Sequence, residues 1–180
     1  MTRRIFDFDA PDRFVAGATG EPGDRTFYLQ ARKGAAVVSV ALEKAQVAAL
    51  AGRLSELLLA VGDEPTTAST ATADRDDAPL DEPLTEVFRV GVMALAWEPS
   101  SERVVIEAQP PSEDGDYVEV ADEATDGPDL MRVRIAADHA REFVRRAAVL
   151  VAAGRPLCPF CGQPLEPTGH FCTRTNGQMN

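Results

Sequence analysis

The chain has 180 residues, is 44% hydrophobic and carries a formal net charge of −11, with a pI near 4.6. A chain of this length can bury one substantial core or two small ones without a disulfide scaffold. Its acidic balance argues against binding to nucleic acid, which depends on neutralising phosphates, and no apolar run approaches the roughly 20 residues of a membrane span. Acidic residues follow too soon after the N-terminus for an apolar signal sequence. We therefore expect a cytoplasmic protein that binds neither nucleic acid nor membrane.

Residues 1–62 are predicted to form a first unit of strands followed by one helix. Strand-like runs separated by turn residues predict an antiparallel meander, and they cover Ile5–Phe8, Arg13–Ala18, Thr26–Arg32 and Ala36–Leu42. After Glu43, apolar residues recur at helical spacing up to Val61, and Gly62 is a stop signal. The pattern predicts one amphipathic helix that packs on one face of a sheet.

Residues 63–83 differ in composition, because they are rich in Thr, Ala, Ser, Asp and Pro and nearly lack large apolar side chains. Such a segment buries too little surface to offset the entropy cost of ordering it. We predict a flexible linker here.

Residues 84–154 are predicted to form a second unit of the same kind. Its strand-like runs cover Val87–Trp97, Arg103–Gln109, Tyr117–Val120 and Leu130–Ala136, and a helix follows from about Ala137 to Ala153. Segment 40–57 aligns with segment 133–150 at one fixed offset, which favours an internal duplication, although any amphipathic helix after a strand would align in part. The predicted fold class is α+β, with two antiparallel meander-plus-helix units and a C-terminal zinc knuckle in residues 155–180.

The tail carries the clearest chemical pattern of the sequence. Cys158 and Cys161 form a Cys-x-x-Cys pair followed by Gly162, which is typical of a turn that directs two thiolates at one metal ion. His170 and Cys172 are two residues apart, so an extended backbone places both side chains on the same face. Four nitrogen and sulfur ligands make a closed tetrahedral set, so the sequence predicts one structural Zn²⁺ held by Cys158, Cys161, His170 and Cys172.

Three alternatives to a structural zinc remain open at this point. The Cys-Pro-Phe-Cys sequence resembles a glutaredoxin active site, but Gly162, Pro164 and Pro167 interrupt the helix that this chemistry needs. The cysteines could also be free thiols on a disordered tail, or could bind a catalytic zinc, for which the four-ligand set leaves no open position.

Other candidate residues have a structural explanation beside the functional one. The carboxylates of Asp7, Asp9 and Asp12 could gather a divalent cation, but acidic residues on an edge strand usually keep it soluble. His139, at the start of a helix, fits a surface or capping residue better than a ligand. The chain contains no Walker loop, dinucleotide fingerprint or nucleophile elbow.

With these motifs in hand, the chain resembles an uncharacterised actinobacterial family of conserved "repeat proteins", a domain of unknown function. The segments that carry the resemblance lie at both ends of the chain; they are 6–8, 13–17, 20–23, 27–32, 40–44, 158–161 and 169–172, with Arg174 and 176–177. The chain has Thr173 where that family commonly has proline. The resemblance implies an actinobacterial cytosol and association with a kinase-like or a phosphoglycerate-mutase-like protein, and it supplies no catalytic residues.

The sequence therefore favours a zinc-binding, non-enzymatic interaction or adaptor module whose partner is another protein. The alternative is an enzyme, or an accessory subunit of one, that acts on a small or phosphorylated ligand in a cleft between the two halves. A pocket that contains Arg13, Arg25 or Arg32 beside Asp7 or Asp9 would favour this alternative, whereas a filled interface would favour the adaptor. The oligomeric state stays open.

Overall fold

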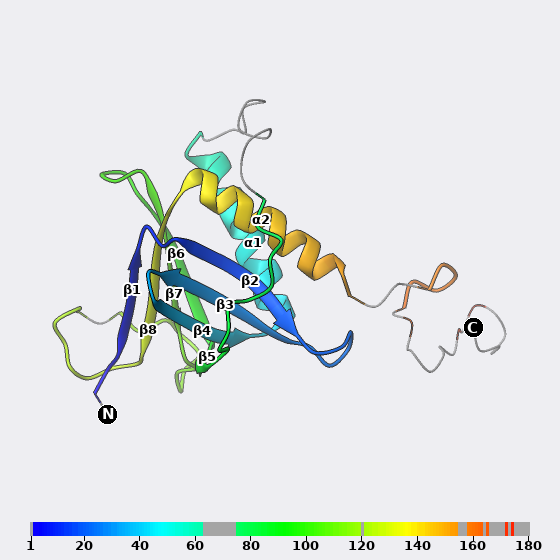
Figure 1. Ribbon diagram of the computed structural model, residues 1–180, viewed down its shortest axis with the longest axis horizontal. Coiled ribbons are helices and arrows are strands. Elements are labelled where there is room, and N and C mark those ends of the chain that lie inside the picture. The colour runs from blue at the N-terminus through cyan, green and yellow to red at the C-terminus, as the bar shows by residue number, and fades with distance from the viewer. Residues whose placement is uncertain are drawn as a thin grey trace.

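The computed structural model describes residues 2–62, 75–119 and 121–154 and, in the tail, 158–163, 165, 172 and 174. Within these residues the chain forms a mixed α+β fold with two four-stranded sheets and two helices (Figure 1). The elements are β1 (Ile5–Asp9), β2 (Arg13–Thr19), β3 (Thr26–Lys33), β4 (Ala36–Leu42), α1 (Lys44–Ala60), β5 (Glu86–Arg89), β6 (Val92–Glu98), β7 (Arg103–Gln109), β8 (Leu130–Ala136) and α2 (Ala137–Ala152). The predicted α+β class is thereby confirmed.

The first sheet has the order β2-β3-β4-β5. Strands β2, β3 and β4 form three of the four strands of the predicted antiparallel meander, whereas the predicted first strand, Ile5–Phe8, lies in the other sheet as part of β1. Strands β3 and β4 are joined by a tight turn between the paired residues Lys33 and Ala36. Gly34 takes a φ of 57° in this turn, a conformation that suits glycine, and its N–H donates to the carboxylate of Asp12 at 2.7 Å. Strand β5 joins this sheet from the second half of the chain, parallel to β4.

The second sheet has the order β1-β8-β7-β6. Strands β6, β7 and β8 form an antiparallel meander, and β1 joins it parallel to β8, with Phe8 opposite Val133. The first strand of each half therefore pairs with the last strand of the other half. This reciprocal exchange is what an internal duplication would produce, and the duplication itself stays a prediction about ancestry.

Two details of the predicted strands are wrong. The run from Val87 to Trp97 is divided into β5 and β6 at Val90 and Gly91. The backbone of Gly91 passes so close to Pro111 that a side chain at position 91 would lie 2.3 Å from it. Residues 117–119 form no strand; instead, the buried side chain of Gln109 holds this segment through hydrogen bonds to the N–H and C=O of Val118, at 3.0 and 2.8 Å.

Both halves of the chain contribute to one continuous hydrophobic core. Helix α1 buries residues at helical spacing, and α2 packs against α1 and along β2. Phe14 of β2 stacks on Phe143 of α2, with ring centroids 4.9 Å apart and planes inclined by 10°. Both rings are almost fully buried, so the contact joins the two halves at the centre of the core. No helix among the described residues is both long and apolar enough to cross a membrane.

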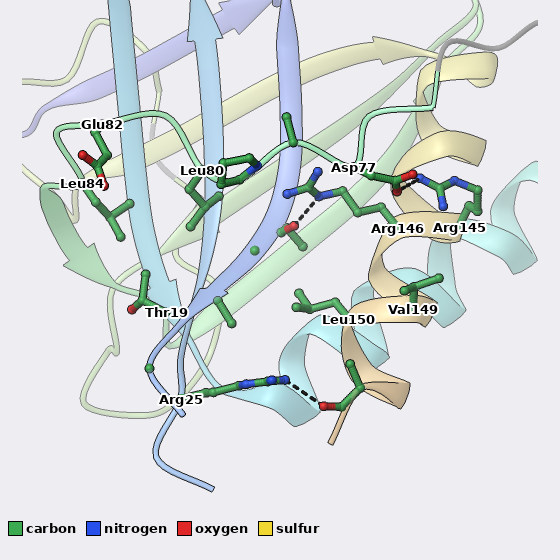
Figure 2. Close-up of a pocket in the computed structure, with 17 residues that line it drawn as sticks. Thr19, Arg25, Asp77, Leu80, Glu82, Leu84, Arg145, Arg146, Val149 and Leu150 are labelled. Atoms are coloured by element: carbon green, nitrogen blue, oxygen red, sulfur yellow. Dashed lines mark hydrogen bonds and ion pairs between the residues drawn. The ribbon is translucent and has the colours of Figure 1, made fainter. Parts of the chain in front are cut away.

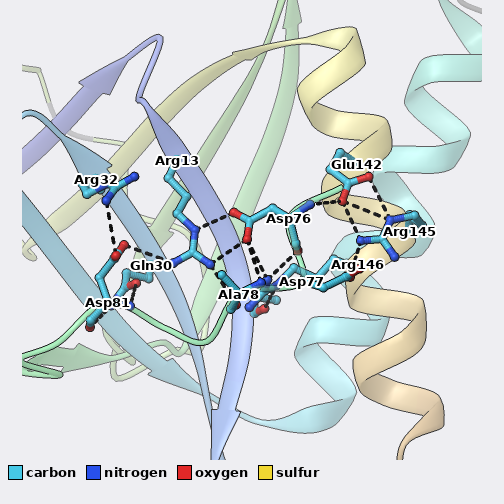
Figure 3. A network of polar contacts seen from close by, with 11 residues as sticks. Arg13, Gln30, Arg32, Asp76, Asp77, Ala78, Asp81, Glu142, Arg145 and Arg146 are labelled. Carbon is cyan, nitrogen blue, oxygen red and sulfur yellow. Dashed lines mark hydrogen bonds and ion pairs between the residues drawn. The ribbon is translucent and has the colours of Figure 1, made fainter. Parts of the chain in front are cut away.

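The segment that follows the gap in the described residues crosses the first sheet, and we call residues 75–85 the strap (Figure 1). Of the predicted linker, residues 63–74 lie outside the described residues, whereas residues 75–83 belong to the strap. The buried guanidinium of Arg13 donates to Asp76 at 2.5 and 2.8 Å and to Asp81 at 3.1 Å (Figure 3). The Gln30 side chain exchanges two hydrogen bonds with the backbone of Asp81. These contacts account for the burial of two polar side chains, Arg13 and Gln30, in the first sheet.

The ion pair between Asp76 and Arg13 is expected to make stability depend on pH. The hydrogen bonds from Arg13 hold the pKa of Asp76 below its ordinary value of 3.8. Because the folded pKa is the lower one, this stabilisation is complete above about pH 5 and is lost as the pH falls through the ordinary pKa towards the folded pKa. Asp76→Asn is expected to lower the free energy of unfolding at pH 7 by about 1–3 kcal/mol.

The measurement is urea unfolding of both proteins between pH 3 and pH 7. The difference between them is expected to be largest at pH 7 and to shrink in acid. Asp77→Asn is the matched control, because Asp77 is exposed and its ion pair with Arg145 lies at the surface, and we expect it to change stability by less than about 0.5 kcal/mol. A difference for Asp76→Asn that stays constant over this pH range would contradict the assignment.

Candidate metal centre

Three cysteine side chains converge at the C-terminal end of the chain. The sulfur atoms of Cys158, Cys161 and Cys172 all lie within 4.8 Å of one another, and those of Cys158 and Cys172 are 3.8 Å apart. Cys158 and Cys172 are buried and Cys161 is partly exposed. The predicted convergence of the three cysteines is therefore confirmed.

A tight turn brings the first two of these thiols together. The N–H of Gly162 donates to the carbonyl oxygen of Cys158 at 2.9 Å, and the N–H of Cys158 donates to the carbonyl of Gln163 at 2.8 Å. Gly162 has a φ of 74°, which a residue with a side chain rarely adopts. The glycine after the second cysteine therefore has a conformational reason to be there.

The spacing of the sulfur atoms fits a metal ion better than a disulfide. A bonded pair would be about 2.05 Å apart, whereas zinc–sulfur bonds of about 2.3 Å place two tetrahedral ligands about 3.8 Å apart. A hydrogen bond from the backbone of Gln163 lowers the pKa of Cys161. Burial and the adjacent thiols of Cys158 and Cys172 raise this pKa by more, so the net shift is upward. Three thiolates this close repel one another, and a bound cation would remove that repulsion.

The fourth predicted ligand, His170, lies outside the described residues, so its position is not part of this geometry. The three aspartates considered as cation ligands in the sequence bind other groups of the protein. Asp7 pairs with Arg134 at 2.6 Å, Asp9 pairs with Arg103, and Asp12 accepts the turn hydrogen bond described above. Within the described ranges, the cysteines are the metal-ligating side chains that cluster.

His139 lies in the first turn of α2, where burial lowers its pKa and a hydrogen bond to the backbone of Phe14 opposes this shift. Its position on the interface between α2 and the first half fits the structural interpretation. The arginines named from the sequence do not meet Asp7 or Asp9 in a pocket, since Arg13 and Arg32 pair with residues of the strap.

Arg25 instead lines a cavity of about 660 Å³ between β2, the strap and α2 (Figure 2). Two further arginines in its wall, Arg145 and Arg146, were not singled out as site residues in the sequence. A signal was present for Arg146, which stands three residues after Phe143 and four before Leu150, on the side of α2 that faces β2.

The fold and the thiol cluster together define a two-sheet α+β protein with a cysteine site able to hold a metal ion. The chain belongs to the family described as "Protein of unknown function (DUF3090)", whose model matches residues 6–172 and so includes every cysteine. No curated protein and no solved structure matches the chain. The resemblance to an uncharacterised family is confirmed at this level, and an actinobacterial source stays a prediction.

Proposed function

We propose that the protein is a zinc-binding, non-enzymatic interaction or adaptor module. One structural Zn²⁺ would be held by Cys158, Cys161, Cys172 and His170. The observation that carries this proposal is the 3.8 Å separation of the Cys158 and Cys172 sulfur atoms, which equals the expected edge of a zinc–thiolate tetrahedron. Thiolates are soft ligands that select zinc over magnesium or calcium, and a set of four leaves no position for a reacting water.

A structural zinc in this tail would fix a surface that the tail could not form alone, because metal binding supplies folding free energy to segments without a core. Phe160 lies between the first two cysteines and is 52% exposed, a high value for a phenylalanine. An aromatic side chain held on a rigid turn is the kind of anchor that protein interfaces use. We therefore assign Phe160 as the first contact residue for a protein partner.

The partners suggested by the family resemblance are a kinase-like protein and a phosphoglycerate-mutase-like phosphatase, and these are the first to test. The test compares full-length tagged variants as baits in a native lysate, with bound proteins identified by mass spectrometry. Phe160→Asp is expected to keep the zinc and lose the partner, and Cys161→Ser is expected to lose both. Leu59→Asp is the matched control, because Leu59 is an exposed apolar residue on α1, away from the tail.

The adaptor proposal is supported if the same identified protein binds the wild type and Leu59→Asp and is absent from the other two baits. It is contradicted if Phe160→Asp and Cys161→Ser retain every protein that the wild type binds.

The second candidate is the enzyme or accessory subunit that acts on a small or phosphorylated ligand between the two halves. One observation favours it, since the cavity beside the strap has β2 of the first half and α2 of the second half as walls.

A further inference from the structure

The cavity between β2, the strap and α2 has the size of a small-molecule site. Its volume of about 660 Å³ lies within the range of about 300–1,000 Å³ that such sites occupy. One wall is the edge of β2, which in the described part of the chain has β3 as its one neighbouring strand. This wall is formed by Ala16 to Thr19 of β2 and by Gly20 directly after the strand, all with small side chains, and Leu80 of the strap packs against Gly17.

Arg146 places a largely buried cation at one end of this cavity (Figure 2). Its side chain is 12% exposed; Nε donates to the carbonyl of Ala16 at 2.7 Å and Nη1 to the carbonyl of Asp76 at 2.6 Å. Its carboxylate contact, to Asp76, is longer at 3.2 Å, and that carboxylate is shared with Arg13. Burial lowers the pKa of Arg146, and the nearby Asp76 opposes this shift only in part. The cation is therefore desolvated and incompletely neutralised, and an added anion would stabilise it.

Arg25 approaches the cavity from the other end, near the turn between β2 and β3, and Leu150 lies between the two arginines in the view of Figure 2. Its Nη1 donates to the carbonyl of Ala153 at 2.9 Å, at the C-terminal end of α2. Among the described residues no hydrogen bond engages its Nε or Nη2. Arg145 differs, because Glu142 and Asp77 both pair with it at 2.6–2.7 Å. The positive charge that neighbouring carboxylates do not neutralise fully therefore comes from Arg25 and Arg146.

The remaining walls determine which kind of anion fits. Leu80 and Leu84 from the strap and Leu150 from α2 supply an apolar lining. The carboxylates of Asp77 and Glu82 also lie in the wall and disfavour a ligand with several negative charges. We propose that this cavity binds a small amphipathic anion, with a single carboxylate or phosphate group beside the Arg25 and Arg146 guanidinium groups and an apolar body against the leucines.

The test is isothermal titration of the full-length protein with four probes: octanoate, octyl phosphate, 1-octanol and inorganic phosphate. Octanoate or octyl phosphate is expected to bind at least about tenfold more tightly than 1-octanol and inorganic phosphate, because only these two carry both the anionic head and the apolar body. The stronger of the two identifies the source of the charge as carboxylate or phosphate.

Two variants change the charge of the cavity wall at positions outside the hydrophobic core. Arg25→Gln removes one guanidinium that is partly exposed, and Val149→Glu adds a carboxylate at a cavity-lining position that is 58% exposed. Each is expected to weaken binding of the preferred probe about tenfold or more. Leu59→Glu makes the same charge change on α1, outside the cavity, and is expected to bind like the wild type.

The proposal is overturned if 1-octanol binds as tightly as both anions, if neither anion binds, or if Arg25→Gln and Val149→Glu bind like Leu59→Glu. The site does not involve the cysteines, so its failure is distinguishable from failure of the zinc proposal.

Discussion

Peptides that contain only one half of the chain, residues 1–62 or residues 75–154 with the strap included, are each expected to lack a cooperative unfolding transition. The sheet of the first half takes β5 from the second half, and the sheet of the second half takes β1 from the first. Helix α2 also packs along β2, so each half alone would expose most of the apolar surface that the shared core buries. The loss of folding should therefore be complete for both peptides.

Thermal denaturation followed by circular dichroism measures this directly, first for each peptide and then for an equimolar mixture. The mixture is expected to recover strand and helix signal, because the exchanged strands can still find their partners. A sigmoidal transition for residues 1–62 alone would show that the first unit folds by itself, and the shared-core account would then be wrong.

Phe143→Ala is expected to lower the free energy of unfolding of the full chain by about 3–5 kcal/mol, the usual cost of truncating a buried phenylalanine. Phe143 is 1% exposed and stacks on Phe14, so its removal opens a cavity where the two halves meet. Small domains have about 5–15 kcal/mol of total stability, so this loss removes a large fraction of it.

Urea denaturation of the wild type and variant tests this value. Val149→Ala is the control on the same helix, because Val149 is largely exposed and its truncation should cost less than about 0.5 kcal/mol. A loss below about 1 kcal/mol for Phe143→Ala would contradict a central role for this contact.

Local patterns in the sequence located most of the secondary structure. The runs predicted for β2, β3, β4, β7 and β8 match the observed strands within one or two residues, and the predicted helices match α1 and α2. These elements are determined by alternation or by helical spacing within short windows. The capping pair of Glu43 and Gln46 also marks the start of α1, since Gln46 accepts the N–H of Glu43 at 2.8 Å.

The pairing partners of β1 and β5 could not be predicted in this way. Both join the distant half in parallel, and a local run of apolar residues carries no information about which distant strand it pairs with. The strap was missed for a similar reason. Its composition is polar, but its aspartates meet the buried Arg13 on β2, a residue more than 60 positions earlier in the chain.

The cysteine cluster was predictable because its ligands are close in sequence and their spacing constrains the geometry. Cys158 and Cys161 belong to one turn, and a fixed set of ligand types indicates one metal. The cavity arginines were harder to find, because Arg146 and Arg25 are remote from each other in the sequence and meet the same cavity only after the halves interlock.

The assignment of a structural zinc site is tested most directly by the metal content of the purified full-length protein, determined by inductively coupled plasma mass spectrometry. The account predicts one zinc per chain, and it predicts that Cys161→Ser loses this zinc while the core of residues 2–154 keeps its cooperative thermal transition. An equimolar zinc content that persists in the Cys158→Ser/Cys161→Ser double variant, or a wild-type protein that contains no zinc when produced in zinc-supplemented medium, would contradict it.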